Sequence, residues 1–134
     1  MSDKYEHLAA KPPEGSFLWG TPEPGTSFNH SYRALLPNND LLISRLEMDD
    51  RDRLLGFAMI HMTHDGREGE MVAELDTRHG EVHIHQYRQG NIRTGRRVLR
   101  IIRSQEDIED GYEEALDVMT EKWEEHRRRW QRGR

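Results

Sequence analysis

The spacing of apolar residues changes at Ser104, and this change constrains the fold more than any other feature of the chain. Before Ser104, short runs alternate apolar and polar residues and are separated by turn-forming residues, a pattern typical of antiparallel strands. After it, apolar residues recur about every 3.6 positions from Ile108 to Trp130. The sequence therefore predicts an α+β fold, an antiparallel meander of about five to six strands packed by one long C-terminal helix over 105–130.

Alternation along two of the expected strands, 71–76 and 81–88, sorts their side chains onto two sides of the sheet. The apolar side consists of Met71, Ala73, Leu75, Val82 and Ile84. We expect the helix to cover this side, because it is the only long apolar partner in the sequence. The polar side is then expected to be open to solvent or to a second subunit. The remaining expected strands cover 28–36, 41–47, 55–62 and 97–103.

A length of 134 residues fits one domain. Four of the five prolines lie in the first 24 residues, so 1–26 is expected to be an extended arm, with the apolar cluster Phe17–Trp19 pinning it to the domain. The single domain is expected over 27–134, with its sheet in 27–103. A helix over 105–130 would be about 39 Å long at 1.5 Å per residue and would overhang the strands. We therefore predict a homodimer through this helix.

Composition excludes several classes of site. Without cysteine the chain has no disulfide, thiolate metal site or cysteine nucleophile. It has no apolar run of membrane-spanning length, so we expect a cytoplasmic protein without a membrane partner. The formal net charge of −5 argues against a uniformly basic nucleic-acid binder, so local charge has to be considered separately.

The polar side of the hairpin formed by 71–76 and 81–88 concentrates chemically active groups. With 77–80 as the loop, the expected register places Asp76 opposite Glu81, and Glu74 opposite His83. The polar set is Glu74, Asp76, Glu81, His83, His85 and Tyr87, with His79 in the turn. One interpretation is an ordinary solvated sheet surface carrying Glu–His pairs.

Two functional interpretations compete with it. In one, His83 and His85 bind a divalent metal such as zinc, completed by Glu74 or His79. In the other, one histidine is a general base and another a general acid, with no cofactor. Glu74 would then orient His83 and raise its pKa.

A basic segment follows directly. Six arginines and no acidic residue lie between Arg88 and Arg103, which favours a phosphate-bearing ligand. By strict alternation Arg88 points away from the histidines, so Arg96, Arg97 or Arg100 would have to supply the charge. Alternatively, these arginines neutralise the acidic start of the helix.

The segment 74–85, ELDTRHGEVHIH, resembles small prokaryotic toxin-like domains, including TumE-like toxins of toxin–antitoxin pairs. The resemblance implies an RNA-directed ribonuclease with Asp76, His79, His83 and His85 at the matching positions. Our hypothesis adds Glu74 to these catalytic residues. The substrate-binding candidates are Arg78, Tyr87, Arg88, Arg97 and Arg100. The alternatives are a divalent-metal-binding domain, or a non-catalytic module that binds a cognate protein in a prophage or toxin–antitoxin system, so whether the protein is an enzyme stays open.

Overall fold

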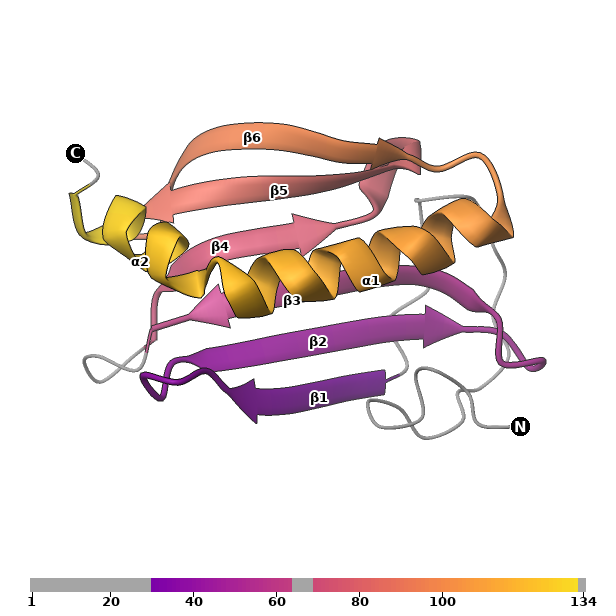
Figure 1. Cartoon of the computed structure of the whole chain (residues 1–134), viewed down its shortest axis with the longest axis horizontal. Helices are drawn as coiled ribbons and strands as arrows, with labels where there is room; N and C mark the ends of the chain where they lie inside the picture. Colours follow the sequence, from indigo (N-terminus) through magenta and orange to yellow (C-terminus); the bar gives the residue numbers. More distant parts are fainter. Residues whose placement is uncertain (1–29, 64–68, 133–134) are drawn as a thin grey trace.

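The computed structural model describes residues 30–63 and 69–132. Its six strands form one antiparallel sheet in which each strand pairs only with its neighbours in the chain. The strands are β1 (His30–Leu35), β2 (Leu41–Met48), β3 (Leu54–Met62), β4 (Met71–Asp76), β5 (Glu81–Arg88) and β6 (Ile92–Ile101). Two helices, α1 (Gln105–Glu121) and α2 (Trp123–Arg132), lie across one side of the sheet (Figure 1). The predicted α+β meander is confirmed, and the predicted arm, 1–26 with its Phe17–Trp19 cluster, falls outside the described residues.

The core lies between the sheet and the helices. Phe57 of β3 meets Tyr112 of α1 edge to face, with ring centroids 5.3 Å apart. Four apolar residues of the β4–β5 hairpin, Ala73, Leu75, Val82 and Ile84, belong to this core. The expectation that they lie under the helical layer is therefore confirmed. We call this side of the sheet the helix face and the other side the histidine face.

The start of α1 follows from local chemistry. Ser104 caps the helix, its Oγ accepting a hydrogen bond of 3.0 Å from the Asp107 N–H. Gly111 lies where α1 passes over β5. A Cβ at this position would stand 2.7 Å from Cγ2 of Val82, so the glycine permits a close approach of helix and sheet. Neither helix has the length and apolar character that crossing a membrane requires.

The prediction of one continuous helix over 105–130 was wrong. The helical path breaks at Lys122, whose φ of −107° and ψ of 17° leave the α region. Beyond the break, α2 packs against β4 and β5, so it does not overhang the strands. Trp130 is buried within the chain and Trp123 packs against the core. The overhang that motivated the homodimer is absent, and the homodimer stays a prediction.

Candidate functional site

The β4–β5 hairpin has a different register from the one expected. Asp76 lies opposite His83 and Glu74 opposite His85, a shift of two residues. The chain reverses through a longer segment, because the 3-10 turn Arg78–Gly80 follows Thr77, whose Oγ1 accepts a hydrogen bond of 3.2 Å from the Phe57 N–H. A shift of two residues preserves the side on which each residue lies, so the predicted polar set stays together.

Three side chains of the histidine face form a compact cluster: Asp76, His83 and His85. Nε2 of His83 is 2.9 Å from Oδ1 of Asp76, and the two imidazole rings pack edge to face with centroids 4.7 Å apart. Each residue offers one ligand atom, and the three atoms lie within 4.8 Å of one another. The polar side was expected to be open, but both imidazoles are buried within the chain. His83 is only 3% exposed and His85 only 6%.

A cavity of about 250 Å³ gives access to this cluster. It is lined by Glu74, Asp76, Arg78, His79, His83, His85, Arg93 and Arg96. All five predicted catalytic residues therefore border one cavity. Of the predicted substrate-binding residues only Arg78 lines it, although Tyr87 lies beside it.

Two bulges in the pairing of β5 with β6 decide which arginines reach this cavity. The register shifts between Gln86 and Tyr87, so Arg93 pairs with Tyr87 and Arg96 with His85. Strict alternation would have separated positions 93 and 96, but the extra residue puts both side chains on the histidine face.

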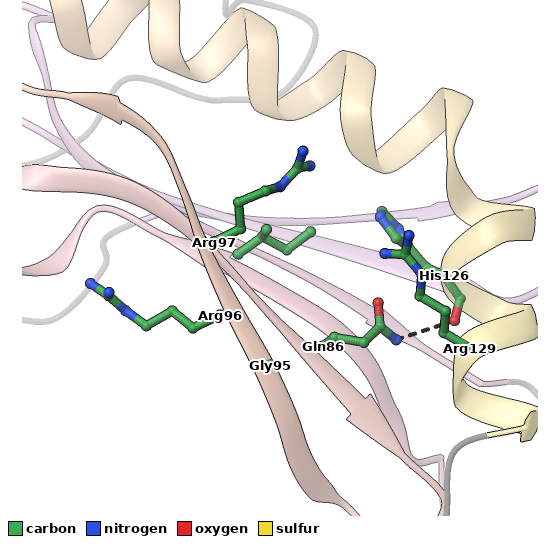
Figure 2. Close-up of a pocket in the computed structure, with 7 residues that line it drawn as sticks. Gln86, Gly95, Arg96, Arg97, His126 and Arg129 are labelled. Carbon is green, nitrogen blue, oxygen red and sulfur yellow. Dashed lines mark hydrogen bonds between the residues drawn. The ribbon is translucent and has the colours of Figure 1, made fainter.

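The second bulge turns Arg100 away from the cavity, whereas Arg97 is already on the helix face because it alternates with Arg96. The register shifts again between Val82 and His83, and Arg97 and Arg100 pair with residues of the helix face. Figure 2 shows Arg96 and Arg97 extending to opposite sides of β6. Arg100 forms ion pairs with Glu114 and Asp107 of α1. For this arginine, the structure therefore agrees with the alternative interpretation, in which the basic segment neutralises the acidic helix. Arg88 and Arg97 do not line the cavity.

Glu74 is held beside the cluster by a different set of contacts. The Tyr87 hydroxyl donates a hydrogen bond of 3.0 Å to Oε1 of Glu74, and Nη2 of Arg93 donates one of 3.2 Å to the same hydroxyl. Burial raises the pKa of Tyr87, so the phenol keeps its proton for this contact. Asp76, not Glu74, therefore stands at the third ligand position beside the histidines.

Burial controls the charge of the two imidazoles. It lowers the pKa of His83 although the Asp76 carboxylate opposes it, and it lowers the pKa of His85 with further help from the Arg93 guanidinium. The expectation that a carboxylate opposite His83 raises its pKa was wrong, because desolvation of the imidazolium outweighs the carboxylate. Both histidines are neutral near pH 7 and keep a lone pair for a ligand.

Glu81 lies close to Nδ1, the ring nitrogen of His83 that does not contact Asp76. Its Oε1 is 3.8 Å from Nδ1 of His83, an atom that is buried and has no hydrogen-bond partner. The guanidinium of Arg96 pairs with the same carboxylate. Neither Glu81 nor Arg93 was among the predicted site residues. Arg93 was missed because the last strand was expected to begin at 97, whereas β6 begins at Ile92.

The comparisons with known proteins give no match to this chain, whether to a family model, a curated protein or a solved structure. The resemblance of 74–85 to TumE-like toxins stays a prediction.

Proposed function

We propose that this domain binds one divalent metal ion, such as zinc, through Asp76, His83 and His85, and acts on a phosphate-bearing substrate held beside the ion. The observation that carries the proposal is the cluster itself, two buried neutral imidazoles and a carboxylate with ligand atoms within 4.8 Å of one another. Imidazole and carboxylate are ordinary zinc ligands, and two histidines with one carboxylate also suit ferrous iron.

The dimensions of the cluster suit an ion. Zinc bonds of about 2.0–2.2 Å in a tetrahedron place ligand atoms roughly 3.3 Å apart. The cluster would therefore contract by about 1.5 Å at most to close around zinc. On binding, His83 exchanges its Nε2 contact with Asp76 for the metal and carries its proton on Nδ1. Glu81 stands 3.8 Å from that atom and is positioned to accept this proton's hydrogen bond, as outer carboxylates do for metal-bound histidines.

Three protein ligands leave a coordination position for water, whose pKa zinc lowers to about 7. Arg93 and Arg96 border the same cavity and carry the charge that a phosphate ester needs for binding. Metal-assisted hydrolysis of a phosphodiester, with RNA in that class, is the reaction that this combination supports.

Metal binding is tested by titrating the purified protein with Zn²⁺ in a calorimeter and with Co²⁺ by visible absorption. We expect one site per chain, and Asp76→Ala, His83→Ala and His85→Ala should each remove it. His30→Ala is the matched control and should bind as the parent does. His30 begins β1, an edge strand that β2 and β3 separate from the β4–β5 hairpin. Equal binding by the parent and all three ligand variants would refute the site.

A metal-independent ribonuclease is the second candidate, favoured by the hydrogen-bond distance of 2.9 Å between Asp76 and His83. Such a pair orients an imidazole and fixes its tautomer for base catalysis. RNA cleavage measured with and without EDTA separates the two mechanisms. Activity that EDTA removes and zinc restores supports the metal mechanism, whereas activity that EDTA leaves unchanged and His83→Ala removes supports the metal-free one. Metal binding without cleavage of RNA or of a model phosphodiester would leave a metal-binding module.

A further inference from the structure

A second cavity lies on the helix face, where α2 meets the β5–β6 hairpin (Figure 2). It has a volume of about 200 Å³ and is lined by Ile84, Gln86, Gly95, Arg96, Arg97, His126 and Arg129. A water molecule takes up about 30 Å³ in the liquid, so a phosphate-sized anion fits with its hydration water. The proposed metal site lies on the other side of the same strands.

Two guanidinium groups border this cavity from different elements. Arg97 extends from β6 toward the helices, and Arg129 extends from α2 toward the sheet. The Arg97 side chain forms no hydrogen bond or ion pair with any residue in 30–63 or 69–132. Arg129 contacts Glu125 at 3.3 Å, in a pair whose side chains are 56% and 48% exposed. Exposed pairs of this kind contribute about 0–1 kcal/mol, so Arg129 exchanges its partner easily.

His126 contributes a buried imidazole to the wall of the cavity. It is 3% exposed and lines the cavity, and its Nδ1 atom is buried without a hydrogen-bond partner. Unsatisfied buried polar atoms are uncommon in folded proteins and call for an explanation. Burial is the main cause that lowers the pKa of His126 to about 4, and His61, Arg129 and Arg97 lower it further while Glu125 opposes them. Neutral His126 therefore carries one N–H to donate and stands in a positive field.

One wall of the cavity is held in place by a glutamine that joins a strand to α2. Gln86 ties β5 to α2, its Nε2 donating to the backbone oxygens of Val72 at 2.9 Å and His126 at 3.2 Å. Gly95 lines the cavity from β6 and contributes no side chain. A Cβ added there would meet nothing within 4 Å, so this part of the cavity is open.

We propose that this cavity is a binding site for a phosphate group, held by Arg97, Arg129 and His126. Two guanidinium groups converging from a strand and a helix match the charge and the acceptor geometry of a phosphate. The group could be a free phosphate monoester or one phosphate of an RNA chain, and the two sources share this chemistry. The site is independent of the metal site, because none of its three binding residues belongs to the metal cluster.

The test is an NMR titration of the whole protein with inorganic phosphate, in parallel with a short single-stranded RNA, at constant ionic strength and with EDTA present. We expect saturable shifts of the Gly95 amide and the His126 ring. Arg97→Gln and Arg129→Gln should each weaken binding by roughly tenfold or more, since each removes charge-assisted hydrogen bonds.

Two controls keep the test specific. Arg128→Gln removes the same charge from the neighbouring position of α2 and should leave binding unchanged. Gly95→Val keeps both arginines but fills the open space, and it should also weaken binding.

Binding of RNA alone, lost in the arginine variants, would assign the site to a polynucleotide. Unchanged binding by Arg97→Gln combined with Arg129→Gln, or no saturable binding of either ligand, would overturn the proposal. Because EDTA is present, neither result depends on the metal site.

Discussion

Two carboxylate–histidine pairs occupy opposite sides of the same sheet. On the helix face, Oδ2 of Asp40 is 2.7 Å from Nε2 of His61, and on the histidine face Asp76 and His83 are 2.9 Å apart. Asp40 and His61 have side chains that are 0% exposed, and Arg127 of α2 pairs with the same carboxylate. Burial lowers the pKa of both histidines, more than their carboxylates raise it.

The difference lies in what surrounds each pair. Arg127 balances the charge of Asp40 and connects α2 to the start of β2, so this cluster holds the helix on the sheet. Asp76 and His83 instead border a cavity together with a second neutral imidazole. A carboxylate–histidine pair is therefore a stabilising contact where it is enclosed and balanced, and a candidate ligand set where a cavity reaches it.

Asp40→Asn should give the largest effect. It leaves the Arg127 charge without its carboxylate beside a fully buried His61, and breaking a buried ion pair in this way costs about 3–5 kcal/mol. Asp76→Asn can still accept the hydrogen bond from the Arg78 N–H, so it weakens only the contact with His83 and should cost about 1 kcal/mol. Urea unfolding at neutral pH measures both free energies. Equal losses would remove the distinction between the two pairs.

The second largest effect is expected from acid, which should lower the free energy of unfolding through His126 on the helix face. The pKa of His126 is about 4 in the folded chain, below the usual value of 6.5, so the unfolded chain takes up this proton first as the pH falls. The stability that neutral His126 contributes is present above about pH 6.5 and is lost by about pH 4, roughly 3 kcal/mol in all. His126→Gln should flatten the fall of unfolding free energy across this window. A fall as steep as in the parent would show that other groups cause it.

Zinc should stabilise the histidine face. At a free concentration of about 100 times Kd, a ligand that binds only the folded state adds about 2.7 kcal/mol to the free energy of unfolding. Unfolding in urea with and without zinc measures this gain, which His85→Ala should abolish and His30→Ala should retain. A gain that survives in His85→Ala would locate the ion elsewhere.

Glu81→Gln should give the smallest effect. The change weakens the acceptor behind Nδ1 of His83 and should lower zinc affinity by roughly tenfold, in line with other outer partners of metal ligands. The metal-free stability should change little, by about 0–1 kcal/mol, because the ion pair that Glu81 makes is with the half-exposed Arg96. Glu121→Gln, at the end of α1, controls for the loss of charge. Unchanged zinc affinity would exclude a supporting role for Glu81.

The fold and the side on which each hairpin residue lies could be predicted, because both depend on local periodicity. Val82 and Ile84 had to be buried and His83 and His85 had to face the other way, whatever the register. The register comes with a turn in which Thr77 accepts a hydrogen bond from Phe57, twenty positions earlier, and no local pattern encodes that contact. The helix break at Lys122 could not be predicted, because no glycine or proline lies near it in the sequence.

The composition of the site was predictable only in part. The histidines, Asp76 and Glu74 were found because they share one side of a hairpin, and Arg78 and Arg96 were among the candidates, but Arg93 was missed. Arg93 and Arg96 reach the cavity through a bulge, and a bulge reverses the alternation on which the prediction relied. The pKa of His83 was predicted in the wrong direction because the sequence shows its charged neighbour but not the depth of its burial.

The order of elements along the chain has a consequence for synthesis. Each strand pairs with the one made just before it, so the sheet assembles progressively as the polypeptide leaves the ribosome. The helices that cover its apolar side come last, at 105–132. Until they emerge, Phe57, Leu75 and their neighbours face water on the nascent chain, and exposed surface of this kind is prone to aggregation. The interval before α1 and α2 dock is thus the stage at which the newly made chain exposes the most apolar surface.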